Sequence, residues 1–524
     1  MLSSEPNYLP PDDRDQEIFE ATVPEDHYLR RVKDVIDFER FRPILAEAYC
    51  NDQGRPAIEP LLLLKLEFLQ YQYNHSDRQV MMHACSNMAY RHFLDLSLHS
   101  SLPHHTLLTY FRQRLGTQRH QQIFDAMVGQ ARERGLVKDR LRLKDATHVL
   151  ANIAIPTTIA LVAQTRERLL QALEPWAADE VSCQRQRAEQ IRQRTEDLSG
   201  AERLLERVVH LRELVAWAEV VCSRDEFRAA LPLQQPQLQE ALELARKVLE
   251  DRADPDGKHH LRSLHDPDAR TAKHGRFYVG YLVDISLDAD SQIITAMNVL
   301  PAGANEGADA ETLLRQEEQA HGNDVQAMSM DSAGYQGAVL QTLTDAEGVN
   351  VEVFTPPRKS VCPHEIKPEH FILSEDKQTL SCPGGQTTNA RRYHEKGEGW
   401  HFRFSRAACA ACPLKESCVP KLPQTTGRTV FKSDYEEQCQ AARAKAQTPE
   451  YAQARREHPA VERKFAELVC RHGARQARYR RQPRVLLQQL LTGLVVNIKR
   501  VVKLLVDPGG AAQGIVRAGG VATG

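Results

Sequence analysis

Two aspartates stand where a buried strand would deliver a carboxylate to the edge of a sheet. In the stretch VQAMSMDSAGYQG, residues 325–337, a short apolar run ends at Asp331 and a Ser-Ala-Gly turn follows. In LRLKDATHVLANIAI, residues 141–155, Asp145 lies within a strand-like run. Open α/β sheets gather their ligand chemistry at the carboxyl ends of their strands. We therefore expect Asp145 and Asp331 to share one site, which would need a third acidic partner.

A predicted helix near the C-terminus supplies the third candidate, Glu462, with Glu457 and Glu467 close by in sequence. Three carboxylates can hold two Mg²⁺ (or Mn²⁺) ions about 3.5–4 Å apart, a site suited to in-line displacement at phosphorus. One metal would activate water or a 3′-hydroxyl, and the other would stabilise the leaving oxygen. The chain has 70 acidic residues, so a solvated or capping acid is the alternative for each candidate.

Cysteines suggest a second metal site, since five of the eleven fall between residues 362 and 418. A CxxC knuckle followed by a third cysteine, with a fourth upstream, is the spacing of a tetrahedral zinc site. The expected ligands are Cys382, Cys409, Cys412 and Cys418. Cys362 and His394 are the reserves, and free thiols in a loop are the alternative.

Basic residues gather locally, although the formal net charge is −2 and excludes a global polyanion-binding character. The segment RHGARQARYRRQPR, residues 471–484, has six arginines and no acid. A helix expected to start at His105-Thr106 carries two more. These arginines are the candidate DNA contacts, with a solvated basic face as the alternative: Arg112, Arg114, Arg471, Arg475, Arg478 and Arg480.

The sequence predicts that an α/β core, a mixed sheet flanked by helices, positions these residues. We expect an N-terminal all-α, helix-turn-helix-like domain, a helical insertion and a cysteine-rich zinc-type insertion as well. An ordinary helical bundle is the alternative for the N-terminal domain. The expected segments are a flexible arm (1–27), a helical DNA-binding domain (28–138), the first core strand (139–156), a helical hairpin (157–256), core strands (257–358), the cysteine-rich insertion (359–425), core helices (426–505) and a disordered tail (506–524).

Periodicity supports several of these elements. Leu61, Leu64, Phe68 and Tyr71 recur at helical spacing, and residues 277–300 alternate around a Leu-Asp-Ala-Asp turn, which predicts a β-hairpin. The N-terminus lacks a signal-peptide pattern, and no apolar run approaches the ~20 residues of a membrane span. We therefore expect a cytoplasmic protein without a membrane partner.

The order strand acid, hairpin, strand acid and helix acid is that of an RNase H-like core. The chain also resembles the DDE transposases of bacterial insertion sequences, in the insertion-sequence-1182 group. The stretches that carry the resemblance are GRPAIEPLLLLKLEFLQY, SDRQV, TLLTYFRQRLG, LKDATHV, HDPDAR, FYVGYLVD, MDSAGYQG, CAACPLKESC and PAVERKFAELVCRHGARQARYR. It extends from about Tyr28 to Leu505, apart from the charged helical insertion.

The resemblance implies Asp145, Asp331 and Glu462 as Mg²⁺ ligands, and Arg455 or Arg456 as a DNA contact. It also implies binding to the element's terminal inverted repeats, followed by cleavage and strand transfer, in a homodimer or higher assembly. The helical insertion is a plausible contact surface for that assembly.

The chain departs from the group's pattern at two positions. Val469 stands where a lysine is usual, and Asp284 stands where a basic residue or histidine is usual. Lys464 or Arg471 is a candidate substitute for the missing cation. The alternative function is a catalytically decayed or co-opted, zinc-stabilised DNA-binding protein, and another nuclease on the same core is a weaker third.

Overall fold

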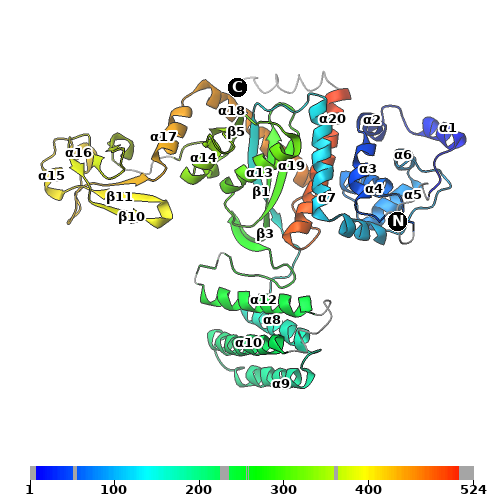
Figure 1. Cartoon of the computed structure of the whole chain (residues 1–524), viewed down its shortest axis with the longest axis horizontal. Helices are drawn as coiled ribbons and strands as arrows, with labels where there is room; N and C mark the ends of the chain where they lie inside the picture. Colours follow the sequence, from blue (N-terminus) through cyan, green and yellow to red (C-terminus); the bar gives the residue numbers. More distant parts are fainter. Residues whose placement is uncertain are drawn as a thin grey trace, which may run out of the picture.

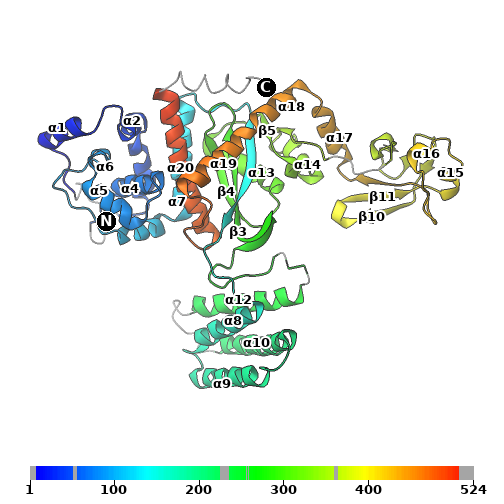
Figure 2. The same ribbon diagram turned by 180° about the vertical axis from the view of Figure 1, so that it is seen from behind.

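The computed structural model describes residues 8–50, 56–224, 235–254, 256–257, 259–358 and 364–506. A central sheet with helices packed on it occupies the middle of the molecule (Figure 1). The N-terminal helices lie on one side of this core and the cysteine-rich region on the other, as the view from behind also shows (Figure 2). A helical insertion projects from a third side.

The central sheet is mixed, as the sequence predicts. Its order is β2-β3-β1-β5-β6, with β4 paired to β3. The pairs of β3 with β1, β2 and β4 are antiparallel, whereas β1–β5 and β5–β6 are parallel. The predicted hairpin over residues 277–300 is formed by β3 and β4. The strands are β1 (Arg142–Leu150), β2 (Arg270–His274), β3 (Arg276–Asp288), β4 (Ile294–Pro301), β5 (Ala327–Ser329) and β6 (Glu352–Phe354).

The N-terminal region is helical. Its elements are α1 (Asp13–Thr22), α2 (Tyr28–Val35), the 3-10 turn η1 (Phe38–Phe41), α3 (Arg42–Ala46), α4 (Pro60–Gln72), α5 (Asp77–Ser86), α6 (Met88–Phe93) and α7 (Thr106–Glu133). The expected flexible arm is wrong for residues 8–27, because α1 is capped by Asp12 and buries Phe19. Arg30 donates a hydrogen bond to the Phe19 carbonyl at 3.0 Å. Residues 1–7 lie outside the described part.

Side chains that cap helix starts define two of the helices in this region. Ser76 caps α5 in a reciprocal capping box with Gln79. α5 ends just before Asn87, whose side chain caps α6. Within α7 the backbone turns at Gly116, where φ is 63°, a conformation that favours glycine.

The insertion is a bundle of four described helices, so the predicted helical hairpin is wrong. The helices are α8 (Thr158–Leu173), α9 (Ala178–Arg194), α10 (Gly200–Ser223) and α12 (Gln235–Ala253). They share a hydrophobic core separate from that of the sheet. The strongly charged helix α9 buries Val181, Ala188 and Ile191. A narrow apolar stripe is enough to pack a helix whose other faces are charged.

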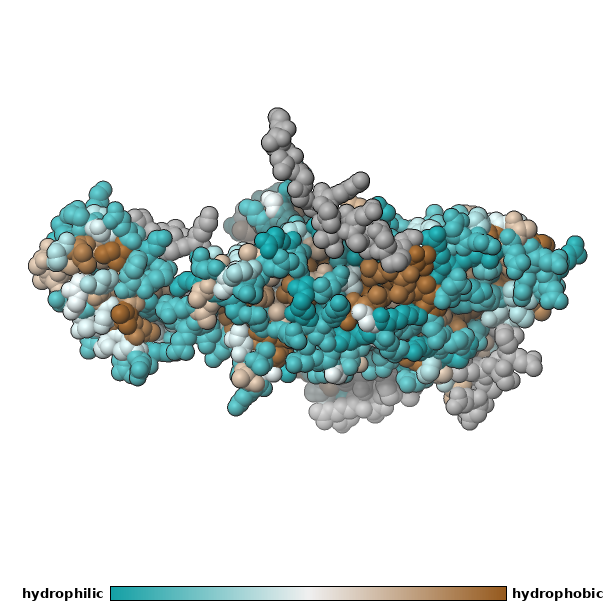
Figure 3. Space-filling model, turned by 90° about the horizontal axis from the view of Figure 1, so that it is seen from above, coloured by the Kyte–Doolittle hydropathy of each residue, from teal (hydrophilic) through white to brown (hydrophobic). Residues whose placement is uncertain are grey.

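The cysteine-rich region contains two small three-stranded sheets. Its strands are β7 (Ile372–Leu373), β8 (Leu380–Ser381), β9 (Thr387–Thr388), β10 (Arg391–His394), β11 (Gly399–Arg403) and β12 (Thr429–Ser433), with short helices α15 (Arg406–Ala410) and α16 (Lys415–Cys418). Seen from above, it forms one end of an elongated and mostly hydrophilic surface (Figure 3).

The remaining helices cover the sheet. They are α13 (Ala310–His321), α14 (Gly337–Thr344), α17 (Glu436–Lys445), α18 (Pro449–Glu457), α19 (Pro459–His472) and α20 (Gln482–Val506). Among the described helices α20 alone is long and apolar enough to cross a membrane, but 83% of its apolar window is buried within the protein. Its Asn497 accepts from the Ile294 N–H and donates to the Ile294 carbonyl, each at 2.8 Å. It is a core helix. The tail expected over 506–524 lies, from residue 507, outside the described part.

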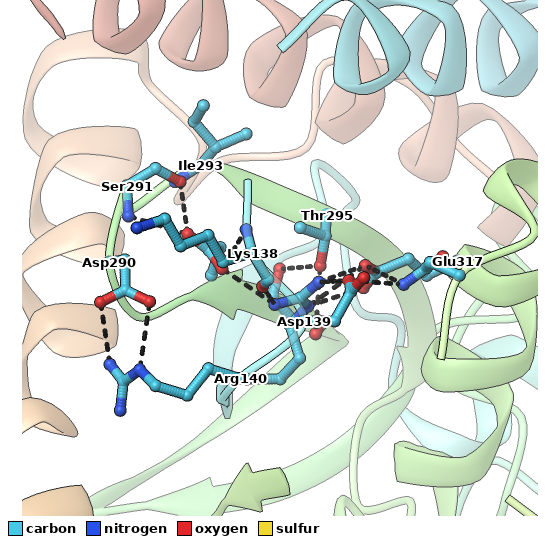
Figure 4. Close-up of polar contacts among 12 residues, drawn as sticks. Lys138, Asp139, Arg140, Asp290, Ser291, Ile293, Thr295 and Glu317 are labelled. Atoms are coloured by element: carbon cyan, nitrogen blue, oxygen red, sulfur yellow. Dashed lines mark hydrogen bonds and ion pairs between the residues drawn. The ribbon is translucent and has the colours of Figure 1, made fainter. Parts of the chain in front are cut away.

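A buried ion network fixes the start of β1. The Arg142 side chain is fully buried and contacts Asp288 at 2.9 Å and Glu317 at 2.6 Å. Asp139, at 3.1 Å, completes the ring of acids around it. Figure 4 shows Asp139 and Glu317 converging from the chain before β1 and from α13. Because a buried charge is tolerated only when it is well paired, this network holds β1 against β3 and α13.

Candidate metal site

Asp145 and Asp331 lie at the same level on adjacent strands. In the parallel pair of β1 and β5, Leu143 is opposite Ser329, and each aspartate lies two residues farther along its strand direction. This is the carboxyl end of β5, and Asp145 lies beside it within β1, which continues to Leu150. The prediction that these two acids share a site therefore agrees with their geometry.

The third acid at this edge is Glu306, which sequence reasoning missed. It follows β4 and directly precedes the short 3-10 turn η2 (Gly307–Asp309). Asp145, Glu306 and Asp331 each offer a carboxylate oxygen, and these oxygens lie within 4.8 Å of one another. All three residues are half-buried. The group is therefore sheltered by the protein yet open to a ligand.

Backbone amides hold the two aspartates. Asp145 accepts a hydrogen bond from the Ala146 N–H at 2.8 Å, and Asp331 accepts one from the Ala333 N–H at 2.9 Å. The second bond caps the 3-10 turn η3 (Ser332–Gly334), so Asp331 is fixed by the Ser-Ala-Gly turn seen in the sequence. The remaining carboxylate oxygens are left for a ligand.

The three acids repel one another electrostatically. Burial, with the charges of Asp331 and Glu306, raises the pKa of Asp145 to about 6. Burial and the charge of Asp331 also raise the pKa of Glu306, against the opposing charge of Lys144. A divalent cation would relieve this repulsion and deprotonate the acids, and oxygen-rich sites suit Mg²⁺ and Mn²⁺. The donor set thus fits the expected metal.

Lys144 holds the loop that carries Glu306. Successive side chains of β1 point to opposite faces, so Lys144 projects away from the face of Asp145. Its ammonium is buried, contacts Asp284 at 2.9 Å and donates to the carbonyl of Glu306. Burial raises the pKa of Asp284 well above its ordinary value. Asp284, noted above as a departure from the group's pattern, therefore forms part of the support beneath the site.

Glu462 is not part of the three-acid group. It lies in the first turn of α19, a helix that packs against β1, and its side chain is exposed. The neighbouring acids are already paired, since Glu457 contacts Arg140 at 2.8 Å and Glu467 contacts Lys499 at 2.8 Å. Across the described ranges Glu462 has no ion pair.

The two candidate substitutes for the missing lysine differ in exposure. Lys464 is buried beside Glu467 at 3.3 Å, so it cannot present its charge to a DNA phosphate. Arg471 is exposed in the last turn of α19. The prediction that Lys464 replaces the missing lysine is therefore wrong. The prediction that Arg471 replaces it stays a prediction.

Arg112 was expected to contact DNA, and the structure contradicts this. Its guanidinium is buried and contacts Asp77 at 2.5 Å and Glu67 at 3.5 Å. It also donates to Gln70 at 3.2 Å. Apolar and basic residues are interspersed along α7. Arg112 lies on the buried side of this helix, where it forms internal ion pairs. Arg114, two residues on, is exposed and lies over the ring of Tyr49 at 4.5 Å.

Two arginines of the predicted basic segment connect parts of the molecule. Gly473, with φ of 67°, ends α19 and turns the chain back along β1. Arg475 then donates to the Thr147 hydroxyl at 3.1 Å and to the His148 carbonyl, just beyond Asp145. Arg478 donates to the His75 carbonyl at 3.1 Å, in the N-terminal region. Both are half-buried, whereas Arg480 is exposed.

The arginines of α18 flank the other aspartate. Arg455 donates to the Met330 carbonyl at 2.8 Å, next to Asp331. Arg456 is exposed and bonds Gln453 at 2.6 Å. His458, buried at the start of α19, bonds Ser329 at 3.1 Å, and burial lowers its pKa to about 4. A neutral His458 thus anchors α19 beside β5.

The four expected zinc ligands line one small cavity, between α15, α16 and β8: Cys382, Cys409, Cys412 and Cys418. Backbone N–H groups donate to Cys382 at 3.3 Å and Cys409 at 3.4 Å. Burial raises the pKa of Cys418, and the other three thiols act in the same direction. The reserve His394 packs instead against His401 on the other small sheet, and Cys362 lies outside the described residues.

Spacing among these sulfurs is wider than among the carboxylates. Within the described part of the chain, Asp145, Glu306 and Asp331 form the only group of three whose ligand atoms lie within 4.8 Å of one another. A tetrahedral site with Zn–S bonds of ~2.3 Å needs sulfurs about 3.8 Å apart. The thiols would therefore have to move closer together to ligate one ion.

Two family models match the chain. One, described as "Transposase domain (DUF772)", matches residues 17–114, and the other, described as "Transposase DDE domain", matches residues 381–502. The first begins within α1, consistent with the ordered start of the helical region. The second includes the cysteines and Glu462, whereas Asp145, Glu306 and Asp331 precede it. No curated protein and no solved structure matches the chain.

Proposed function

Because the two family matches identify the chain as a DDE transposase of insertion-sequence type, a metal-dependent DNA-transferring enzyme, we propose that it cuts its element's ends and joins them to target DNA. The observation that carries the proposal is the group of Asp145, Glu306 and Asp331 beside the carboxyl end of β5. The resemblance to the insertion-sequence-1182 group and the RNase H-like course of the sheet support it.

We propose that Asp145, Asp331 and Glu306 hold Mg²⁺ or Mn²⁺ in the free protein. Glu462 is the further ligand, reaching the site from α19 when DNA is bound. When bound, two such ions would polarise the attacked phosphate, activate the attacking oxygen and stabilise the leaving oxygen. The protein's part is to hold the carboxylates rigidly, through the two backbone amides and the Lys144 contact with the Glu306 loop.

DNA contact is proposed for the helical N-terminal region and the exposed arginines. Residues 28–116 would bind the terminal inverted repeats as a helix-turn-helix-like domain. Arg114, Arg456, Arg471 and Arg480 are exposed and available to phosphates. Arg475 and Arg455, beside the two aspartates, would contact the strand being cut. The enzyme acts on DNA, so its place is the cytoplasm.

A structural zinc ion is proposed for the four cysteines. Half-buried thiols facing one cavity, with N–H donors to two of the sulfurs, are the environment of a thiolate metal site. The region is small, with its sheets built from short strands, and metal ligation would supply the stability that so small a core lacks.

The second candidate function is a zinc-stabilised DNA-binding protein without catalysis. Val469 in place of the usual lysine favours it, as does the position of Glu462 outside the acid group. The gathered pair Asp145 and Asp331 favours the enzyme.

The test is cleavage of a labelled duplex carrying the element's own ends, with Mg²⁺ or Mn²⁺, by the wild type and Asp331→Ala. End-specific cutting that disappears in the variant supports the transposase and the metal role of Asp331. Tight end-binding by both proteins with no cutting by either supports the non-catalytic alternative.

A further inference from the structure

The small sheet β10-β11-β12 packs only one of its faces into the cysteine-rich region. Because directly opposite residues of paired strands lie on the same face, the strand register separates the two sets of side chains. On one face, Phe402 and Val430 are buried in an apolar core beside Cys409 and Cys418. The other set, which we call the outer face, belongs to no apolar core of the described residues: Arg392, His394, Gly399, His401, Arg403, Thr429, Phe431 and Ser433.

A group of rings lies at the centre of the outer face. Arg392, His401 and Phe431 form one row across the three strands. The centroid of the His401 ring lies 5.1 Å from that of Phe431 and 5.3 Å from that of His394. Gly399 leaves space for the Phe431 ring, since a Cβ at this position would come within 2.7 Å of it. His394 is exposed and the other two rings are half-buried, so solvent reaches all three.

Positive charge flanks these rings. Arg392 and Arg403 are exposed, and within the described ranges neither has an ion pair. None of the eight outer-face residues is acidic, and the nearest acids in sequence, Glu395 and Glu398, lie in the turn between β10 and β11. In the helical insertion, by contrast, exposed arginines each pair with a glutamate: Arg192, Arg194 and Arg246. The two outer-face guanidinium groups therefore remain available to an anionic partner.

Rings between unpaired arginines suit a single strand of DNA. Such a strand exposes the flat faces of its bases, which stack on aromatic side chains, and phosphates, which arginine binds. Burial, with the charges of His394 and Arg403, lowers the pKa of His401, so its ring is neutral at neutral pH. A neutral ring between cations matches a neutral base between phosphates. In a duplex the bases stack on one another, and their faces cannot reach the rings.

We propose that the outer face of β10-β11-β12 binds single-stranded DNA, with bases stacked on Phe431 and His401 and phosphates bound by Arg392 and Arg403. The sheet lies on the opposite side of the core from the N-terminal helices (Figure 1, Figure 2), so this surface is separate from the region proposed to bind duplex ends. The inference rests on the proposed function in one respect, the choice of DNA as the polyanion. The surface would hold a strand that is unpaired near a cut end.

The test measures binding of a short, labelled oligothymidylate to the full-length protein by fluorescence anisotropy at several salt concentrations. Arg392→Gln with Arg403→Gln should weaken binding at least about tenfold and lower the slope of log affinity against log salt by roughly 1.4, because two phosphate contacts are lost. Phe431→Leu keeps an apolar side chain but removes the ring. It should weaken binding about fivefold or more and leave the salt slope unchanged, because only stacking is lost.

The matched control removes two charges from the segment that carries the cysteines. Arg406 and Lys421 are exposed, and Arg406 starts α15 and donates to the Pro423 carbonyl at 3.2 Å. Arg406→Gln with Lys421→Gln should bind as the wild type does. The arginine variant should keep the wild-type thermal unfolding, because both of its substituted side chains are exposed.

Photo-cross-linking locates the bound strand. With 5-iodouracil in the oligonucleotide, the cross-link should map to the peptides that hold His401 or Phe431, and a duplex of the same length should compete weakly for it. Cross-links confined to other segments, equal competition by the duplex, or wild-type affinity in the arginine variant would each overturn the proposal. Neither metal nor element ends are needed, so a protein that cannot cut DNA still gives the expected result. End cleavage without this cross-link would overturn the proposal and leave the proposed function intact.

Discussion

At the scale of single residues, the main property of the acid group is the electrostatic repulsion among its three carboxylates. Three half-buried carboxylates with oxygens within 4.8 Å are costly without a cation, and the raised pKa values of Asp145 and Glu306 record that cost. Glu306 takes the place that the sequence assigned to Glu462. The two glutamates make different predictions for metal binding in the absence of DNA.

Glu306→Gln should weaken Mn²⁺ binding to the free protein by at least about tenfold, because it removes a ligand from the preformed group. Glu462→Gln should leave this affinity unchanged and lower the rate of end cleavage. Titration calorimetry and the cleavage assay separate the two effects. Glu311→Gln, an acid on the next helix, is the matched control. Equal loss of Mn²⁺ affinity in both glutamate variants would contradict the assignment.

Metal affinity should depend on pH around the pKa of Asp145. That pKa, about 6, is raised above its ordinary value, so the protonated form is favoured in the metal-free protein. Below pH 6 an ion must displace this proton, and affinity should fall by about tenfold per pH unit. In Glu306→Gln the fall should begin at lower pH, because one repelling charge is gone. Mn²⁺ affinity that is constant between pH 5 and 7 would contradict this.

The raised pKa also has a consequence for folding. A carboxyl with a raised pKa in the folded state favours folding when protonated. For the metal-free protein, this contribution is present below the unfolded pKa of about 4 and is lost as pH rises through about 6. Bound metal reverses the sign. Asp145→Asn should remove this dependence, as measured by thermal unfolding between pH 4 and 7.

At the scale of elements, arginines on one helix have different functions according to the face they occupy. Arg112 should be structural, and its replacement by alanine should destabilise the protein by about 3–5 kcal/mol because Asp77 and Glu67 lose their buried partner. Arg114→Ala should leave stability unchanged and weaken DNA binding. Urea unfolding and end-binding as a function of salt give the two readouts. A stable Arg112→Ala protein with weakened DNA binding would reverse the assignment.

The cysteine-rich element should bind one zinc ion per chain. Cys412→Ser should lose the ion and lower the stability of this region, because tetrahedral ligation needs all four thiolates. Cys470, exposed on α19, is the matched control, and Cys470→Ser should retain zinc. Metal released on denaturation, measured with a chromogenic chelator, decides the matter. Wild-type protein that holds no zinc after purification in the presence of zinc would contradict the site.

At the scale of the whole molecule, separate hydrophobic cores make the insertion an independent module. The sheet and N-terminal helices share one core, while α8, α9, α10 and α12 share another. Replacing residues 158–253 with a flexible linker should therefore leave the remainder folded and able to bind element ends. Loss of the cooperative unfolding of the remainder would show instead that the sheet requires the insertion.

The sequence alone determined features that depend on neighbours along the chain. Strand patterns located Asp145 and Asp331, and alternation around a turn located the β3–β4 hairpin. The CxxC spacing brought four cysteines to one cavity. Each of these rests on local propensity or on a short repeat, which single residues encode directly.

Only the tertiary structure decided which distant groups meet. Glu306 joins the acid group because Lys144 fixes a loop that follows β4, and nothing in its local sequence separates it from the other 69 acids. Arg112 is buried because acids from α4 and α5 lie opposite it. The charged helix α9 joins the bundle of the insertion because three apolar residues, Val181, Ala188 and Ile191, are buried there. Long-range contacts decide which of these residues are buried and which partners they pair with. The sequence alone did not distinguish these residues from others of the same type.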